Sequence, residues 1–342
     1  MFKIENIKRI LKPYLVNLLL LGIALIIYKN LSYYKSFLYI ETQTVLTLIF
    51  FIYAIFGLPY YFLKRKYSDG DSTEKAILVL HIFTKILPSR FSSSKGERKG
   101  HIFDRETKVA LLSYAVKFFF LPIMINFFFT NFSSLVRYST QFTFTPPSST
   151  ILFDQIFNII YNFIFVLDTI IASFAYAVEV PFLKNRIKSV DFTFFGWGVC
   201  LATYPPFNST VASIIPLTTG PYAIITSEVV LKIIRVLTLI SYGVYVWATV
   251  ALGVKFSNLS NRGIVSKGPY RFIRHPAYAA KNFAWWLEYL PSLSNISTAV
   301  FLLAWNFIYY LRAVTEERHL MQDIDYQQYA KKVRYRFIPF VF

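Results

Sequence analysis

Residues 45–63 read VLTLIFFIYAIFGLPYYFL, a run without a single charged side chain. A helix needs about 20 mostly apolar residues to cross the hydrocarbon core of a bilayer, so this run predicts a membrane span. Outward from it, seven more apolar stretches follow the same rule: Pro13–Tyr28, Val109–Phe129, Ile151–Val178, a run from Phe192 that breaks at Tyr204-Pro205-Pro206, Val229–Val254, Ala277–Leu290 and Ser297–Ala313. The sequence therefore predicts an all-α, polytopic membrane protein with about eight transmembrane helices.

The composition supports this class and excludes others. Of 342 residues, 55% are hydrophobic and 16% are charged, whereas a soluble domain carries about 25% charged residues. This excludes a disordered chain and disfavours a water-soluble domain. A single cysteine excludes an intrachain disulfide and a cysteine-built zinc site, and four histidines leave little for a metal cage. No metal site is predicted.

The net charge of +18 could indicate nucleic acid in a soluble protein. In an apolar chain it indicates cytoplasmic loops beside anionic lipid, so no nucleic-acid partner is expected. Lys and Arg gather at the amino end, in the loop 64–108, after the sixth span and in the tail. This predicts that both termini are cytoplasmic. The apolar segment 211–226 holds two prolines and a glycine, which favours an interfacial or re-entrant segment on the outer side.

The predicted organisation has two parts. Residues 1–190 form an N-terminal transmembrane region of about four spans with the basic loop 64–108. Residues 191–342 form a second transmembrane core that carries most of the polar groups with chemical potential.

The first polar feature of that core is the segment Gly268–Tyr278, which reads GPYRFIRHPAY and directly precedes the seventh span. Pro276 suits the first turn of a helix, where its missing N–H costs nothing, and His275 then lies near the N-cap. Free backbone N–H groups there, with Arg271 and Arg274, favour a carboxylate or phosphate. The alternative is an interfacial anchor, since Arg and Tyr are common at any membrane edge.

The second feature lies at the end of the eighth span, in the sequence RAVTEERHL over 312–320. At helical spacing Tyr309, Arg312, Glu316 and His319 share one face, which should look into a water-filled cavity. Glu317 points about 100° away from Glu316, so the two carboxylates do not form a matched dyad. The alternative is a solvated helix end with Arg–Glu pairs.

The third feature is the basic tail, in which Tyr326, Tyr329 and Val333 share one helical face. It predicts an amphipathic helix on the membrane surface, which either covers a site or simply binds lipid. Spans seven and eight form a hairpin, so His275 and Glu316 should lie on the same side of the membrane. Together the three features predict a C-terminal cytoplasmic cradle that binds a cofactor.

The order of these motifs resembles the integral-membrane methyltransferases typified by isoprenylcysteine carboxyl methyltransferase and the phospholipid methyltransferases. The matching positions are Gly268-Pro269-Tyr270, Arg274-His275-Pro276, Tyr278, Glu316-Glu317 with Leu320, and then Tyr326, Tyr329, Val333 and Pro339. The resemblance is confined to the C-terminal part of the chain. It departs from the family after Tyr278: the family usually has a glycine two residues after this tyrosine, whereas here Ala279, Ala280 and Lys281 follow it.

The resemblance implies S-adenosylmethionine as cofactor and a membrane-resident acceptor, either a lipid phosphate, a lipid amine head group or a prenylcysteine carboxylate. The implied cofactor-binding residues are Tyr270, Arg274, His275, Pro276, Tyr278, Glu316, Glu317 and Leu320. Arg274, Glu317 and His319 are the candidate catalytic residues, the latter two as proton acceptors if the acceptor is an amine. Lys281, Arg312 and Tyr329 are the candidate acceptor-binding residues. A multi-pass protein with a cytoplasmic site is expected, in a bacterial inner membrane rather than the endoplasmic reticulum.

Two other functions stay open at the level of sequence. Sterol reductases, which use NADPH, also carry an R-H-P-x-Y segment and a proline near the terminus, but they have an Asn where Ala277 stands and differ around Glu316. A non-enzymatic lipid-binding or transport protein would need intramembrane charges, which Lys117, Asp154 and Asp168 could supply.

Overall fold

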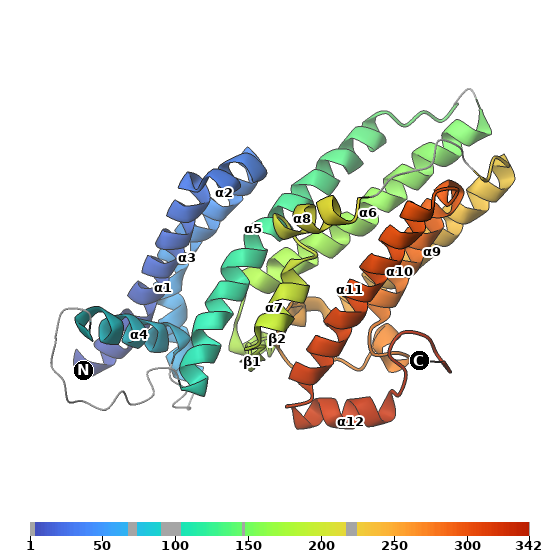
Figure 1. Cartoon of the computed structure of the whole chain (residues 1–342). Helices are drawn as coiled ribbons and strands as arrows, with labels where there is room; N and C mark the ends of the chain where they lie inside the picture. The colour runs from blue at the N-terminus through green and yellow to red at the C-terminus, as the bar shows by residue number, and fades with distance from the viewer. Residues whose placement is uncertain (1–3, 68–73, 90–103, 146–147, 217–223, 342) are drawn as a thin grey trace. The chain divides into compact units, whose positions relative to one another are not determined.

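The computed structural model describes residues 4–67, 74–89, 104–145, 148–216 and 224–341, and these are overwhelmingly helical (Figure 1). They form two compact units, Met1–Asn126 and Phe127–Phe342. The predicted all-α class is confirmed, because the described strands are limited to one two-residue pair.

The first unit contains α1 (Ile4–Asn30), α2 (Ser32–Phe37), α3 (Ile40–Tyr67), α4 (Lys75–Ser89) and the first part of α5 (Arg105–Thr140). A buried amide on α5 holds the turn between α2 and α3. The side-chain oxygen of Asn126 accepts hydrogen bonds from the Tyr39 N–H at 2.8 Å and the Thr42 hydroxyl at 2.9 Å. Lipid offers no substitute partners, so such internal pairing is required in a membrane protein.

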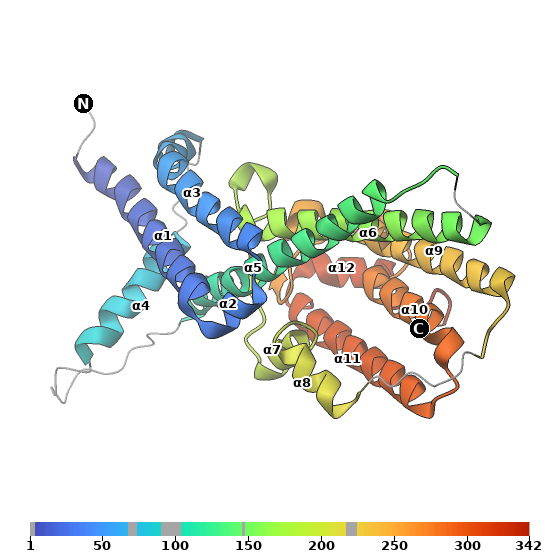
Figure 2. The ribbon, with the colours of Figure 1, turned by 90° about the horizontal axis from the view of Figure 1, so that it is seen from above.

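The second unit contains the rest of α5 and the helices that build the candidate site. These are α6 (Ser149–Ala177), α7 (Phe194–Leu201), α8 (Phe207–Ile214), α9 (Glu228–Leu252), α10 (Pro276–Tyr289), α11 (Ile296–Leu320) and α12 (Ile324–Lys332). Figures 1 and 2 show α9 lying alongside both α6 and α10. Their shared core is the buried cluster of Ile164, Tyr242 and Ala284. Although α6 precedes the predicted boundary at residue 190, it packs within this unit.

Short irregular elements connect these helices on the side where α6, α9 and α11 end. They include the 3₁₀ turns η1 (Pro181–Leu183), η2 (Gly253–Lys255) and η3 (Gly268–Arg271). The strands β1 (Ser189–Val190) and β2 (Ser260–Asn261) pair antiparallel, with Ser189 opposite Asn261. This pairing ties the loop after α6 to the loop after α9.

Six of the described helices are long and apolar enough to cross a bilayer, which agrees with a multi-pass membrane protein. They comprise Ile10–Asn30, Ile40–Leu63, Arg105–Thr140, Ser149–Ala177, Glu228–Lys255 and Ile296–Leu320. The expected count of eight single-helix spans is not reached. The fifth and seventh predicted spans correspond to α7 with 8 residues and α10 with 14, both shorter than the roughly 20 residues a span needs.

The interruption of the fifth predicted span has a local cause. The consecutive prolines Pro205 and Pro206 lack backbone N–H groups, so α7 ends and α8 begins separately. The segments before α7 and after α8 lie at opposite ends of the α10–α11 hairpin. Before α7, Ser189 contacts His319 near the end of α11. After α8, the Ile224 N–H donates to the Pro291 carbonyl at the turn η4 (Leu290–Ser292). The proposed re-entrant segment 211–226 lies partly outside the described residues.

Candidate functional site

Glu317 joins the loop before α10 to the end of α11. Its Oε1 accepts hydrogen bonds from Arg274 Nε at 2.7 Å and contacts His275 Nε2 at 3.0 Å, while its Oε2 accepts from Arg336 Nε at 2.9 Å. The residue is only 3% exposed. Two guanidinium groups and an imidazole therefore engage both carboxylate oxygens, as a buried charge requires.

The tail is bound to the same loop. Arg274 Nη1 donates to the carbonyls of Val333 and Arg334 at 3.0 and 2.8 Å. The backbone N–H groups of Arg274 and His275 donate to the carbonyls of Tyr335 and Arg336, each at 2.9 Å. The chain after α12 thus lies beside the loop that precedes α10 and holds it through backbone as well as side-chain contacts.

The predicted apolar face of the tail helix is confirmed. Tyr326, Tyr329 and Val333 form one buried cluster, which packs against Tyr270 and Leu320. The Tyr329 hydroxyl donates to the Tyr270 carbonyl at 2.6 Å. Since α12 buries its aromatic face against protein, it covers the loop rather than presenting that face to lipid.

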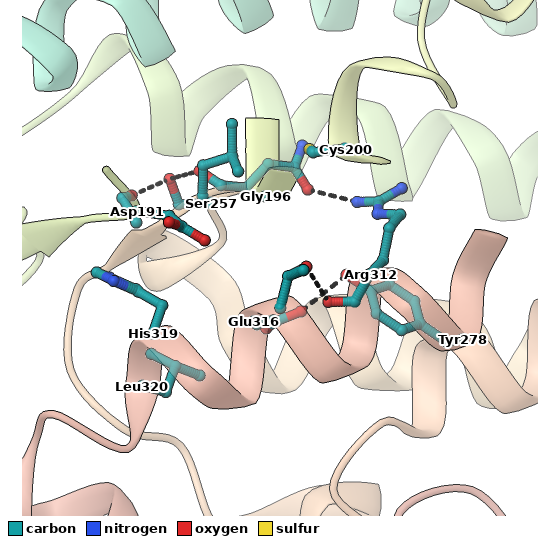
Figure 3. Close-up of a pocket in the computed structure, with 13 residues that line it drawn as sticks. Asp191, Gly196, Cys200, Ser257, Tyr278, Arg312, Glu316, His319 and Leu320 are labelled. Carbon is teal, nitrogen blue, oxygen red and sulfur yellow. Dashed lines mark hydrogen bonds between the residues drawn. The ribbon is translucent and has the colours of Figure 1, made fainter. Parts of the chain in front are cut away.

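Glu316 behaves differently from its neighbour. Its Oε2 accepts a hydrogen bond from the Tyr278 hydroxyl at 2.8 Å, and no other hydrogen bond to this carboxylate comes from the residues that the structure describes. Glu316 and Ser257 both line three adjoining cavities in the second unit. Figure 3 shows Glu316 beside Tyr278 and Arg312 in one of them. Oε1 of Glu316 thus has no hydrogen-bond partner among the described residues.

The first cavity, here the loop cavity, spans about 580 Å³ of space, open solvent at its mouth included. Its wall combines apolar and aromatic side chains from α9, the following loop and α12, among them Leu252, Ile264, Tyr270 and Tyr329. Its polar members include Lys255, Arg262, Arg274, Glu316 and Tyr326. The Tyr326 hydroxyl is buried and has no hydrogen-bond partner within the described chain. Burial, with a further effect of Glu317 and Glu316, raises the pKa of Tyr326, so this hydroxyl stays a neutral donor.

The second cavity, here the helix cavity, lies among α9, α10 and α11 and spans about 640 Å³ of space, open solvent at its mouth included. Three cationic side chains line it: Arg274, which is engaged by Glu317, and two others, Lys281 and Arg312. Lys281 Nζ lies 5.5, 5.4 and 6.0 Å from the ring centroids of Tyr245, Trp285 and Tyr309. Arg312 donates to the Thr203 hydroxyl at 2.6 Å and to the Asn258 side-chain oxygen at 3.0 Å. Aromatic faces thus hold the Lys281 ammonium beside the cavity, and a hydroxyl and an amide oxygen hold the Arg312 guanidinium.

The third cavity, here the α7 cavity, lies between α7 and α11 (Figure 3) and spans about 400 Å³ of space, open solvent at its mouth included. Arg312, Glu316 and His319 all line it, as the helical spacing predicted. Across it lies Asp191, whose carboxylate accepts hydrogen bonds from the Thr193 N–H at 2.8 Å and from Arg318 at 3.1 Å. His319 Nε2 is 3.1 Å from the Ser189 hydroxyl.

The structure brings most of the predicted site residues together. The cavities are lined by Tyr270, Arg274, His275, Tyr278, Lys281, Arg312, Glu316, His319, Leu320 and Tyr329. Glu317 is absent from all three linings, and its engaged carboxylate favours a positioning role over the predicted catalytic one. Pro276 is buried at the start of α10, where it fits the first helical turn.

Sequence reasoning missed the residues that come from loops. Ser257 and Asn258 follow α9, and Asp191 and Tyr204 flank α7, yet all four line the site. Arg262 was also missed: it is 2% exposed and donates to the Ala175 carbonyl at 2.7 Å, near the end of α6. Irregular segments carry no periodic pattern, so only their polar composition could have signalled these positions.

Among the described residues no cluster of three or more His, Cys, Asp or Glu side chains could hold a metal ion.

The two aspartates that the transport alternative requires both have partners within the protein. Asp154 forms an ion pair with Arg235, and Asp168 accepts hydrogen bonds from Tyr245 and Thr249.

A comparison with known protein families finds a matching family over residues 223–322 of the chain. The matching family is isoprenylcysteine carboxyl methyltransferase (ICMT). The ICMT match spans α9, the following loop, α10 and α11, and includes both Arg274 and Glu316. No curated protein matches the chain. The resemblance predicted from the sequence is confirmed, and the ICMT match supports a membrane methyltransferase, an enzyme that methylates.

Proposed function

We propose that the second unit is an S-adenosylmethionine-dependent methyltransferase whose acceptor is a membrane-resident molecule with an anionic group. One observation carries the proposal: the loop cavity and the helix cavity meet at Glu316, the site carboxylate with an oxygen that makes no hydrogen bond in the structure. Two adjoining cavities suit a reaction between two ligands of different origin.

The loop cavity fits the cofactor. A purine and a ribose need an apolar wall and hydroxyl partners, and Leu252, Ile264 and the ring of Tyr329 supply such a wall. The unpartnered hydroxyl of Tyr326 and the carboxylate of Glu316 offer a donor and an acceptor. Lys255 and Arg262 offer positive charge for a carboxylate. When bound, S-adenosylmethionine supplies a methyl group that its sulfonium has already activated.

The helix cavity fits the acceptor. It lies among membrane helices, so a lipid-borne group could enter from the side, and Lys281 with Arg312 would bind a carboxylate or phosphate. Of the three acceptors implied by the sequence, the anionic two are favoured over the amine. An ionised oxygen needs no general base, which agrees with a Glu317 that is fully engaged elsewhere.

Arg274 and His275 have a positioning role in this proposal. Through Glu317 they hold the loop and the tail against α11, so that Tyr270, Tyr278 and Glu316 keep a fixed arrangement around the two ligands. Basic residues in the loops on this side favour a cytoplasmic location, where the cofactor is available. Water exclusion by the docked tail would strengthen each electrostatic contact.

The proposal is tested by ligand-dependent stability of the purified protein in detergent. S-adenosylhomocysteine, the product form of the cofactor, should raise the melting temperature, because a ligand at 100 times its Kd stabilises by about 2.7 kcal/mol. NADPH at the same concentration should not. Stabilisation by NADPH alone would favour the reductase reading and overturn the assignment.

A further inference from the structure

We propose that Asp168 is a positioning residue of the acceptor site: acting through Tyr245, it keeps Lys281 positively charged toward the helix cavity. Its effect on acceptor binding rests on the proposed function, whereas its effect on the charge of Lys281 does not. Asp168 lies on α6, which precedes the ICMT-matched residues, so nothing in that match assigns it a role.

Both oxygens of the buried Asp168 carboxyl group are held by hydroxyl groups of α9. Asp168 is 6% exposed. Its Oδ2 accepts a hydrogen bond from the Tyr245 hydroxyl at 2.7 Å, and its Oδ1 accepts one from the Thr249 hydroxyl at 2.6 Å. Both donors come from α9, and both residues also line the helix cavity. Asp168 therefore lies directly behind one wall of that cavity.

Tyr245 connects this carboxylate to the lysine. Its hydroxyl donates to Asp168, and its ring centroid lies 5.5 Å from Lys281 Nζ. A phenol that donates to a carboxylate becomes more electron-rich, because hydrogen-bonded groups polarise one another. The ring face then attracts the ammonium more strongly. Trp285 and Tyr309 complete the aromatic surround of Lys281.

The surrounding charges explain why a carboxylate is needed. The groups that act on Lys281 come from four helices and the segment after α7: Asp168 on α6, Tyr245 on α9, Glu288 on α10, Tyr309 and Arg312 on α11, and Tyr204. Arg312 repels Lys281, whereas Asp168 attracts it. Asp168 and Glu316 thus provide two carboxylates close to Lys281 and Arg312, while Arg274, the third cation of the cavity wall, is paired with Glu317.

The test measures the charge of Lys281 directly, without reference to catalysis. Acetic anhydride reacts with a neutral amine and not with an ammonium. The full-length protein in detergent would be labelled across a pH series and the Lys281 peptide quantified by mass spectrometry. The variants are Asp168→Asn, which removes the charge at constant size, and Tyr245→Phe, which removes the connecting hydroxyl. The matched control is Asp154→Asn, the same change on an exposed pair of the same helix.

In Asp168→Asn the pH of half-maximal labelling should fall by about one unit or more, the size expected for the loss of a nearby opposite charge. Tyr245→Phe should give a smaller fall, and Asp154→Asn none. An unchanged midpoint in Asp168→Asn overturns the proposal. If that variant does not fold, an unchanged midpoint in Tyr245→Phe overturns it instead.

An activity measurement separates this inference from the proposed function. If methyl transfer occurs, Asp168→Asn should raise the acceptor KM at alkaline pH about tenfold, without weakening S-adenosylhomocysteine binding. Adding Lys281→Arg to Asp168→Asn should restore the low acceptor KM at alkaline pH, because arginine keeps its charge there. Equal loss of both affinities would indicate a merely structural Asp168 and overturn the proposal. If Asp168→Asn shifts the labelling midpoint while the wild-type protein transfers no methyl group, the inference is supported and the proposed function is contradicted.

Discussion

Glu316 and Glu317 are consecutive residues of α11 whose carboxylates belong to separate networks. The Glu317 carboxylate contacts the side chains of Arg274, His275 and Arg336. Among the described residues, the Glu316 carboxylate accepts a hydrogen bond only from the Tyr278 hydroxyl. The helical turn of about 100° between neighbours produces this division. One carboxylate fixes the loop and the tail, and the next one faces the cavities.

The two glutamates should therefore respond differently to the same substitution. Glu317→Gln should destabilise the protein by about 3 kcal/mol or more, because it leaves buried cations without their charged partner. Glu316→Gln should remain close to wild type in stability. Cys200, the single cysteine, is 4% exposed, so a thiol-reactive dye reports thermal unfolding. Equal melting temperatures for the two variants would contradict the division of roles.

Tyr278→Phe removes the one hydrogen bond to Glu316. We expect S-adenosylhomocysteine affinity to fall about 3- to 10-fold, since a typical hydrogen bond contributes about 0.5–1.5 kcal/mol. Isothermal titration measures this. Tyr289→Phe, at the other end of α10, is the control and should bind normally. A Tyr278→Phe protein with wild-type affinity would separate Glu316 from cofactor binding.

Arg336→Ala should loosen the tail. Arg336 contacts Glu317 through its side chain, whereas the Arg334 side chain is exposed and only its carbonyl is used. Limited trypsin digestion should therefore cut the tail of Arg336→Ala several times faster than that of Arg334→Ala. Both changes remove one trypsin site, so the comparison is matched. Identical digestion rates would count against the docked tail.

Gly196→Ala should disturb the α7 cavity. A Cβ at this position would overlap the Asp191 carboxylate, with Asp191 Cγ only 2.7 Å away, and would displace it from Arg318. Two residues on in the same helix, Gly198→Ala meets open space and should gain up to about 1 kcal/mol from helix propensity. Thermal melts by circular dichroism should shift in opposite directions. A shift in the same direction for both would contradict the close approach of Gly196 and Asp191.

Asp323 is the N-cap of α12, where its side chain accepts a hydrogen bond from the Asp325 N–H, and this cap should weaken in acid. Burial opposes ionisation of Asp323, but hydrogen bonds from Asn261 and the Asp325 N–H, with the Lys188 ammonium, hold its pKa below the usual value. A lowered native pKa stabilises above the unfolded value of about 3.9, and this contribution is lost as the pH falls through the native pKa.

Melting temperatures at pH 6 and pH 3 provide the measurement. The difference between the two should be smaller in Asp323→Asn than in wild type. The control is Asp325→Asn, whose carboxylate is 61% exposed and lies 3.8 Å from Lys188. An equal pH dependence in wild type and Asp323→Asn would show that this carboxylate does not contribute.

The sequence predicted those parts of the structure that regular patterns encode. Apolar runs located the six long helices, and helical spacing correctly placed Arg312, Glu316 and His319 on one cavity face. It also grouped Tyr326 with Tyr329. These predictions succeed because the period of a helix is fixed by backbone geometry.

Other parts depend on tertiary contacts that have no sequence period. The apolar run after Phe192 looks like a span, but two prolines divide it into short helices. The partners of Glu317 come from segments 19 to 43 positions away, so spacing alone could not assign them. Asp168 meets Tyr245 and Thr249 for the same reason.

The most direct test of the central claim is methyl transfer itself. Purified protein would be incubated with radiolabelled S-adenosylmethionine and the membrane lipid and lipidated-protein fractions of its host, and label would be counted in the organic extract. We expect incorporation by wild type and Asp154→Asn, and a strong reduction in Glu316→Gln with its fold intact. Incorporation by Glu316→Gln at the wild-type rate would contradict it.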